Sequence, residues 1–452
     1  MSKKRYNPMN FFQELAESRD VNKQRALDKA LVDACLGNDD DAVIDLLQKG
    51  ASPEGEVYAV AQAMSGENFR RPLMAAVING NKKMAQLLIE NGADTSGKDK
   101  YGVQAIHCAA QSGHRDCVRL LLDAGASANA ETGDFNKIGV YQKPFRRGTT
   151  PLHMAAKLNH VGCIEELVEH GRADVNQRDV IGMSCLNTAC KLGHEESILT
   201  ILRLSEGQKL GTGMTIGTGN TPLHDCVRWG LLEATKALLR RGADVNRPNP
   251  TGYTPLHFAL IQTDSTAQDI TEALILHSQG VDLNLPMGKG SLRPLHFVAF
   301  EPDRATHIHI HTIEYRMSND HITCDPGRPH RDPALARFLI AYGADFEVEY
   351  HGVSLLQQEI YSQSDDTVLD AILAVTHSFE IPNQPEQVSF ARAAEVGAEK
   401  RVARLREFFR APRTLQHQCH LLIRRLLTPR RLNRLNELRL PEKLKDYILL
   451  RS

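Results

Sequence analysis

Residues 221–246 read TPLHDCVRWGLLEATKALLRRGADVN, and this stretch predicts a pair of helices. Thr221 suits a helix N-cap, and Pro222 suits the first helical position, where its missing N–H costs nothing. An apolar stripe follows as far as Gly230, which ends the first helix. A second apolar helix runs from there to Gly242, which we expect in the left-handed conformation of a helix C-terminus.

Two phrases from this stretch recur along the chain. Pro-Leu-His occurs at residues 151–153, 222–224, 255–257 and 294–296. Gly-Ala followed by Asp or Ser occurs at residues 50–52, 92–94, 125–127, 242–244 and 343–345. The interval is 33 residues from His224 to His257 and also from Gly92 to Gly125. One helix pair of this size cannot bury its apolar face alone, so stacked copies must complete the core.

This pattern resembles the ankyrin repeat, because the period and both phrases recur together. The resemblance implies an all-α ankyrin-repeat solenoid of about eight or nine repeats over residues 27–378, after an N-terminal extension over 1–26. We expect insertions near 131–147, 205–219 and 302–332. The eight expected repeats cover residues 27–55, 68–98, 101–131, 147–179, 181–210, 218–249, 251–285 and 291–348, and a degenerate ninth near 351–378 would act as a cap.

The charge of the chain is divided unequally. Over 452 residues, 54 Lys and Arg balance 55 Asp and Glu. Residues 400–452 hold 15 Lys and Arg against four Asp and Glu, a net charge of +11, so the preceding residues carry −12. The overall balance argues against a surface built for nucleic acid, and the acidic part favours a basic partner.

The remaining composition indicates a soluble, reduced protein. No apolar stretch is long enough for a membrane span, and the basic N-terminus lacks the apolar core of a secretory signal. The nine cysteines include no CxxC pair, which argues against a disulfide framework or a zinc ribbon. We therefore expect a cytoplasmic protein that could also be nuclear, with no cofactor.

The C-terminal region forms a separate basic segment. A Pro-rich turn and a helical connector are expected over residues 379–411, followed by three short helices over 412–452. Leu415, Cys419 and Ile423 share one face of the first of these helices. Three helices of about ten residues bury too little surface to be independently robust, so this stripe needs a partner.

The segment resembles a SOCS box. The elongin-binding pattern of that motif is met by Thr414, Leu415, Cys419 and Ile423. Its cullin-binding pattern is met by Leu438, Leu440, Pro441, Leu444 and Tyr447, whereas Arg439 stands where the family usually has a proline. Ankyrin repeats followed by a SOCS box is the order found in the ankyrin repeat and SOCS box proteins.

That resemblance implies a substrate receptor of a cullin–RING ubiquitin ligase. The SOCS box would bind Elongin C with Elongin B, and cullin-5 with its RING-box protein. The repeats would hold a protein substrate, so the chain would supply proximity and no catalysis. The alternative is a ligase-independent ankyrin scaffold, which Arg439 favours slightly.

Substrate contacts are expected at the tips of the connections between repeats and on the first helices. The candidates are Tyr101, Arg146, Arg147, Trp229 and Tyr253, since Tyr, Trp and Arg dominate binding hot spots. For Trp229, packing against the next repeat is the favoured interpretation and a binding anchor is the alternative.

Other candidate sites have structural explanations that fit better. The histidines of the Pro-Leu-His phrase recur once per repeat, which is typical of capping groups and not of catalysis. His307, His309 and His311 alternate, with His321, Cys324 and His330 nearby, yet a solvent-facing strand or a binding loop is favoured over a metal site. The arginines of the tail lack interleaved aromatic residues, so nucleic-acid binding is not expected.

Overall fold

A computed structural model gives the fold of the chain. It describes residues 8–54, 57–58, 69–99, 101–133, 146–208, 210, 219–262, 266–277, 280–287, 293–299, 332–346, 349–350, 353–354 and 367–375. The chain divides into two compact units, unit 1 over Met1–Ile216 and unit 2 over Gly217–Ser452. Within the described ranges, no helix is long and apolar enough to cross a membrane.

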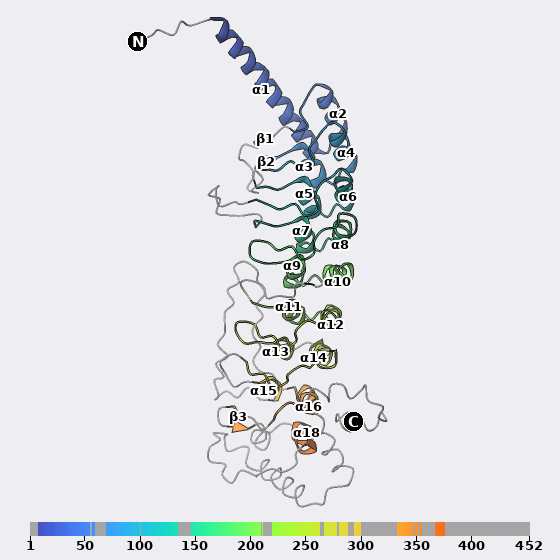
Figure 1. The fold of residues 1–452 in the computed structure, drawn as a ribbon, viewed down its shortest axis with the longest axis vertical. Coiled ribbons are helices and arrows are strands. Elements are labelled where there is room, and N and C mark those ends of the chain that lie inside the picture. The colour runs from blue at the N-terminus through green and yellow to red at the C-terminus, as the bar shows by residue number, and fades with distance from the viewer. Residues whose placement is uncertain are drawn as a thin grey trace, which may run out of the picture. The chain divides into compact units, whose positions relative to one another are not determined.

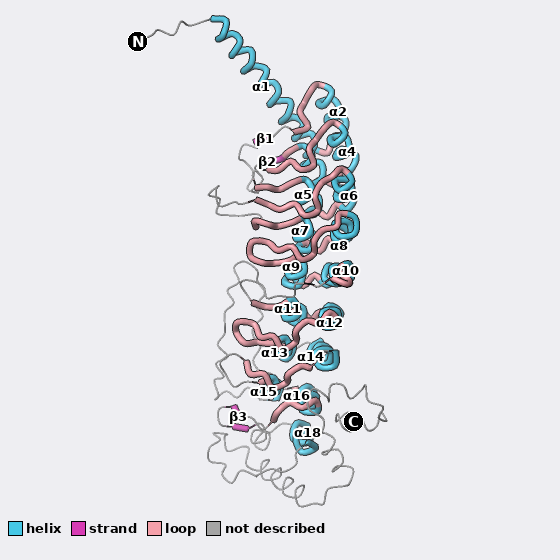
Figure 2. The backbone as a smooth tube through the Cα atoms, viewed as in Figure 1, coloured by secondary structure: helices cyan, strands magenta, loops and turns pink. Residues whose placement is uncertain are grey.

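Unit 1 is a stack of helix pairs (Figure 1). The inner helices are α1 (Pro8–Gly37), α3 (Pro72–Ile78), α5 (Ala105–Ser112), α7 (Pro151–Lys157) and α9 (Cys185–Leu192), and each contacts the next. The outer helices are α2 (Asp40–Gln48), α4 (Lys82–Glu90), α6 (Arg115–Asp123), α8 (Val161–Glu165) and α10 (Glu195–Leu204). Long connections, here called fingers, join each outer helix to the next inner helix (Figure 2).

Unit 2 repeats this arrangement. Its inner helices are α11 (Pro222–Arg228), α13 (Pro255–Ile261) and α15 (Pro294–Ala299), and its outer helices are α12 (Leu232–Arg240), α14 (Thr266–His277) and α16 (Pro333–Ala341). A further helix, α18 (Thr367–Val375), packs against α16. Two short antiparallel hairpins complete the described elements, β1 (Val57–Tyr58) with β2 (Phe69–Arg70) in unit 1, and β3 (Glu349–Tyr350) with β4 (Val353–Ser354) in unit 2.

The helical architecture predicted from the repeated phrases is confirmed. α15 and α16 flank the expected insertion at 302–332, of which residues 302–331 lie outside the described residues. At the N-terminus, α1 runs without a break from Pro8 to Gly37, so the expected boundary at residue 26 falls inside a helix.

Buried histidines cap the inner helices and join neighbouring repeats. In α11, Thr221 N–H donates to His224 Nδ1 (3.2 Å), so the ring proton resides on Nε2 and is donated to Tyr253 O (2.9 Å). His153 makes the same bridge to Met183 O (2.9 Å). Each ring therefore closes its own helix N-terminus and fixes the next finger, which is the structural role predicted for these residues.

Burial keeps these histidines neutral. It lowers the pKa of His107, His224 and His257 to about 4, and it also lowers the pKa of His153. The imidazolium form would lose its hydration, and it could not accept the N–H at Nδ1. The same position in α9 holds Asn187, whose Oδ1 accepts from Ser184 N–H (3.2 Å).

A second row of histidines joins the inner helices at their other ends. Nε2 of His114 bonds to Ile78 O (2.9 Å), and Nε2 of His160 bonds to Gln111 O (3.0 Å). The ring of His114 lies against Gly80, where a Cβ would stand 2.6 Å from it and where φ is +72°. Glycine is required there by both the backbone conformation and the close approach.

The fourth outer helix contains one additional residue. The interval from His153 to Ala173 is 20 residues, compared with 19 from His224 to Ala243. The extra residue is accommodated by a π-helical turn, Glu166–His170, which continues α8. Arg172 then takes a left-handed φ of 51° at the place where Gly242 precedes Ala243 elsewhere.

The buried histidines make stability depend on pH. Their folded pKa values lie below the unfolded value of 6.5, so the unfolded state gains protons first as the pH falls. We expect the free energy of unfolding to have its full value above pH 6.5. It should decrease towards pH 4, by up to about 1.4 kcal/mol per pH unit for each histidine. Urea unfolding followed by circular dichroism at several pH values measures this.

The control for that experiment comes from α9. His224→Asn copies the cap formed by Asn187 and removes one titrating ring. The free energy of unfolding should therefore depend less steeply on pH. An unchanged slope in this variant would contradict the assignment of the acid sensitivity to these caps.

The left-handed Arg172 gives a second prediction. A non-glycine residue there costs roughly 1–2 kcal/mol, partly offset by the entropy that glycine loses on folding. Arg172→Gly should therefore raise the free energy of unfolding by about 0.5–1 kcal/mol in urea. Arg241→Gly is the matched control, because Arg241 has a φ of −84° and its replacement should destabilise the protein. Equal destabilisation by both changes would show that Arg172 is not strained.

Candidate functional site

The finger tips of the repeats share one backbone construction. Oδ1 of Asp179 accepts from Ile181 N–H (3.0 Å) and from Met183 N–H (2.9 Å), and Gly182 follows with a φ of 72°. Asp99 and Asn249 hold their own tips in the same way. The two residues after the Asp or Asn are thus presented at fixed positions, as an Asx turn requires.

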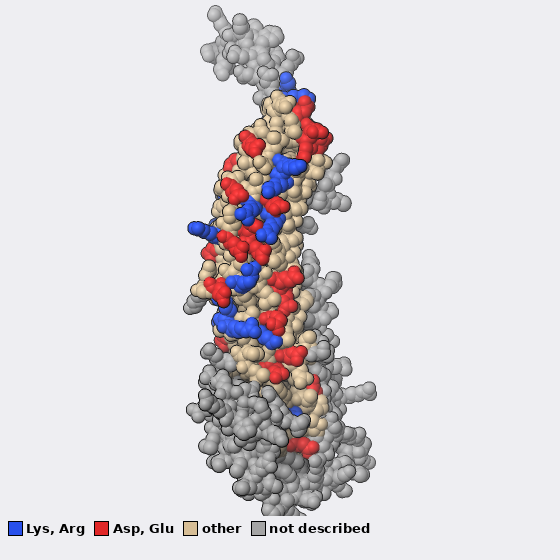
Figure 3. Space-filling model, turned by 90° about the vertical axis from the view of Figure 1, so that its right-hand side faces the viewer, with Lys and Arg blue, Asp and Glu red and all other residues tan. Residues whose placement is uncertain are grey.

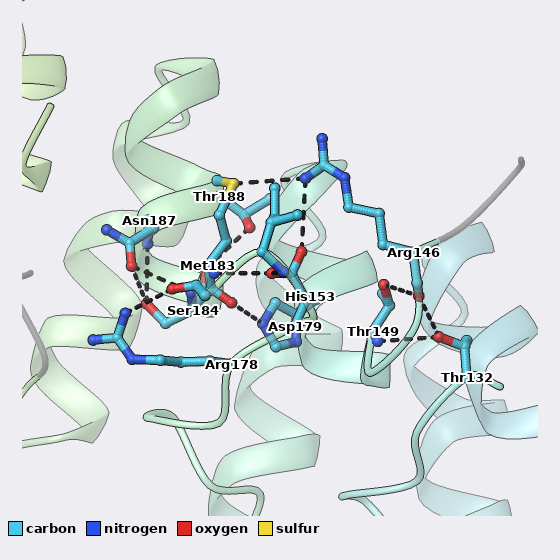
Figure 4. A network of polar contacts seen from close by, with 12 residues as sticks. Thr132, Arg146, Thr149, His153, Arg178, Asp179, Met183, Ser184, Asn187 and Thr188 are labelled. Carbon is cyan, nitrogen blue, oxygen red and sulfur yellow. Dashed lines mark hydrogen bonds and ion pairs between the residues drawn. The ribbon is translucent and has the colours of Figure 1, made fainter. Parts of the chain in front are cut away.

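The finger between α6 and α7 keeps this construction despite its insertion. Thr132 takes the place of the Asp, because its Oγ1 accepts from Thr149 N–H (3.0 Å) and its carbonyl accepts from Gly148 N–H (3.1 Å). Thr132 Oγ1 also donates to Arg146 O (2.5 Å). The inserted residues therefore fall between Thr132 and Arg146 in the sequence (Figure 4), and Arg146 and Arg147 precede the left-handed Gly148 as the two tip residues precede Gly182.

Two neighbouring tips are joined at Arg146 and Arg147. The exposed Arg146 guanidinium lies 3.6 Å from Asp179 Oδ2, and its Nη1 is 3.6 Å from Met183 Sδ (Figure 4). Arg147 is also exposed, and its carbonyl accepts from Val180 N–H (3.0 Å). The structure thus brings these two predicted residues against the next tip.

The other predicted contact residues are less accessible. Tyr101 is buried, with 8% of its surface exposed, and its carbonyl accepts from Gly133 N–H (2.9 Å). Tyr253 is half-buried, and its ring packs against Phe258 with a centroid distance of 5.6 Å. The half-buried Trp229 lies under the Arg228 guanidinium at 5.4 Å. Trp229 and Tyr253 belong to unit 2, whereas the two arginines belong to unit 1.

Four residues of the same repeats were not predicted as contacts. Val180 has 60% of its surface exposed at a finger tip, and Leu158 has 44% at the end of α7. Lys157 precedes Leu158, and Lys191 occupies the matching position in α9. Aligning the repeats on the Pro-Leu-His phrase would have placed these residues beside the predicted ones.

The outer helices of unit 1 carry charges that are mutually paired. Figure 3 shows basic and acidic side chains side by side over this face. The nearly buried Glu166 accepts from Arg115 (2.8 Å) and lies 3.3 Å from Arg119, and Arg203 contacts Glu165 (2.9 Å). This network crosses three successive outer helices and includes the π-helical turn.

The described residues contain no group of His, Cys, Asp and Glu arranged to hold a metal ion. His307, His309, His311, His321, Cys324 and His330 lie outside these residues. The predicted elongin-binding residues (Thr414, Leu415, Cys419 and Ile423) and cullin-binding residues (Leu438, Leu440, Pro441, Leu444 and Tyr447) also lie outside them.

Comparison with known proteins identifies both parts of the chain. A family model for ankyrin repeats matches residues 31–132, 135–212 and 201–287, and a SOCS box model matches residues 411–449. Ankyrin repeat and SOCS box protein 16 of Homo sapiens is 29% identical over 42% of this chain and 47% of its own length. Ankyrin repeat and SOCS box protein 11 of Danio rerio is 36% identical over 24% of this chain and 34% of its own length.

A relative without a SOCS box in its name is similar in the repeats. B-cell lymphoma 3 protein homolog of Mus musculus is 31% identical over 42% of this chain and 40% of its own length. The chain thus spans less than half the length of each of these relatives. Because the ankyrin model covers more than half of the sequence and the SOCS box model follows it, the chain belongs to the ankyrin repeat and SOCS box proteins.

Proposed function

We propose that this protein is the substrate receptor of an Elongin B/C–cullin-5 RING ubiquitin ligase. The observation that carries the proposal is the SOCS box over residues 411–449, placed after a long array of repeats. A SOCS box is a docking segment, and stacked repeats offer an extended surface for a second protein. One chain thereby holds a ligase and a substrate at the same time.

The contribution of the chain is proximity. Holding the substrate near the ubiquitin-charged enzyme turns a bimolecular encounter into a transfer at high effective concentration. Leu415, Cys419 and Ile423 would pack against Elongin C, and residues 438–447 would contact the cullin. The cullin's RING-box partner and a conjugating enzyme would perform the chemistry, so we propose no catalytic residue in this chain. The setting would be the cytoplasm or nucleus.

A ligase-independent scaffold is the second candidate. Arg439 favours it, because a proline usually stands at that place in the cullin-binding pattern. The two functions differ in whether the tail binds elongin, which makes the tail the first place to test.

The tail gives the decisive experiment. Leu415→Ala combined with Cys419→Ala should abolish co-purification with Elongin B/C, since each buried apolar side chain contributes about 1.5–3 kcal/mol. Circular dichroism should show that the repeats stay folded. A matched control is Arg430→Ala with Arg431→Ala, which alters the same tail outside the apolar stripe. Undiminished elongin binding by the Leu415 and Cys419 variant would sink the receptor proposal.

Trp229 and Tyr253 remain proposed substrate contacts in unit 2. The acidic charge before residue 400 favours a basic segment there. Trp229 is the single tryptophan, so its fluorescence reports directly on this site. We expect a short peptide of Lys and aliphatic residues to shift that emission.

Replacing both rings tests this assignment. Trp229→Ala with Tyr253→Ala should weaken binding of the labelled basic peptide by at least about 2 kcal/mol, with little change in thermal stability. Phe at both positions retains the apolar area and should preserve most of the affinity. If stability falls while affinity holds, these rings serve packing and not binding.

A further inference from the structure

The inner side of the fourth and fifth repeats carries basic and aliphatic residues in two rows. The first row is the pair of tips, Arg146-Arg147 and Val180-Ile181. The second row is the pair of inner-helix ends, Lys157-Leu158 and Lys191-Leu192. We propose that these rows bind a substrate segment in which carboxylates alternate with aliphatic side chains, a proposal that rests on the receptor function above.

The first row is continuous from one finger to the next. Arg147 O accepts from Val180 N–H (3.0 Å), and the Arg146 guanidinium reaches Asp179 and Met183 of the neighbouring finger. Each tip is followed by a left-handed glycine, Gly148 with a φ of 73° and Gly182 with a φ of 72°. Cations and aliphatic groups are therefore side by side on a preorganised backbone, which limits the entropy lost on binding.

The second row is held in register by a histidine. Nε2 of His194 bonds to Lys157 O (3.0 Å), which joins the end of α7 to the start of α10 directly after α9. Lys157 and Lys191 each stand six residues after the first residue of their helix, and Leu158 and Leu192 follow. Figures 1 and 2 place α7 and α9, which carry this row, between the fingers and the outer helices.

The charge of this side differs from that of the outer face. On the outer helices the arginines are paired with Glu165 and Glu166. Among the described residues of the two tips, the carboxylate is Asp179, which is buried and holds two backbone N–H groups besides facing Arg146. Glu131, which directly precedes Thr132, accepts from the Gln177 side chain (2.6 Å).

Two physical features select the occupant. Arginine forks bind carboxylates through charge-assisted hydrogen bonds, and a guanidinium has five donors, so the contacts of Arg146 leave others for a ligand. Val180 and Leu158 offer exposed aliphatic area that a purely acidic chain would not use. The rows contain no aromatic side chain on which a base could stack, which favours an acidic peptide over RNA.

The test is a titration of the full-length chain in complex with Elongin B/C. The probe is a short fluorescent peptide of Asp and Glu alternating with Leu and Ile, and its counterpart has Ser in place of the aliphatic residues. Fluorescence anisotropy should show at least about tenfold tighter binding of the first peptide, weakening between about 0.05 and 0.3 M NaCl. Equal binding of the two peptides would overturn the aliphatic part of the proposal.

Charge reversal locates the site. Arg147→Glu with Lys157→Glu should lower the affinity for the acidic peptide by about tenfold or more. This variant leaves the Arg146–Asp179 contact in place. Val180→Ser should lower the affinity for the acidic peptide several-fold without changing how that affinity depends on salt. The matched control is Lys82→Glu with Lys83→Glu, two exposed lysines at the start of outer helix α4, which should leave affinity unchanged.

Three results would overturn the proposal. The acidic peptide could fail to bind the wild type, could bind the Arg147 and Lys157 variant with unchanged affinity, or could be outcompeted by a single-stranded RNA that binds more tightly. Elongin co-purification is followed in every sample. If the protein still co-purifies with elongin and one of these results is found, only the peptide-binding proposal is contradicted. If the wild type does not co-purify with elongin, the receptor proposal is contradicted and the peptide result remains valid.

Discussion

The structure depends on a neutral imidazole held between two repeats. Two Pro-Leu-His histidines, His153 and His224, accept a backbone N–H at Nδ1 and donate from Nε2 to the finger of the next repeat. Each ring satisfies a helix N-terminus and a finger carbonyl that would otherwise be buried without partners. Because burial lowers the pKa of these rings, the protonation state that the bridge needs is also the one that the core imposes.

Hydrogen bonds within the fingers also fix the backbone away from the core. Asp179 and Asn249 accept the backbone N–H four residues later, and Thr132 accepts that of Thr149 across the insertion, so the tip residues can vary without altering the backbone. The long insertion before Arg146 is tolerated for the same reason, since Thr132 closes the finger stem by its own bonds. The tip residues can thus differ without a change in the scaffold, which suits the proposed receptor function.

The charge distribution shows how a scaffold of this kind can present different surfaces. The outer helices of unit 1 pair their charges across repeats, and Glu166 does so from a π-helical turn created by one additional residue. The inner side of the same repeats exposes cations beside aliphatic groups. Net charge is a sum over all faces, so the basic segment that it favours and the acidic segment proposed for unit 1 are expected at different sites.

The sequence by itself determined the helical repeats, their caps and the SOCS box. The Thr-Pro-Leu-His and Gly-Ala-Asp phrases act locally, through an N-cap, a proline at the first helical position and a left-handed glycine. Their structural effect can therefore be predicted from the sequence without knowledge of the fold. The apolar stripe expected from Leu415, Cys419 and Ile423 rests on an equally local pattern.

Only the tertiary structure decided which tip residues are accessible. Tyr101 and Arg146 looked equivalent as finger residues, yet Tyr101 is buried and Arg146 is exposed. The extra residue of the fourth repeat is accommodated by a π-helical turn and a left-handed Arg172, which the sequence pattern did not predict. Whether a side chain is buried, paired or accessible depends on contacts between neighbouring repeats. In a repeat protein many residues together specify these contacts, so they cannot be predicted from one position alone.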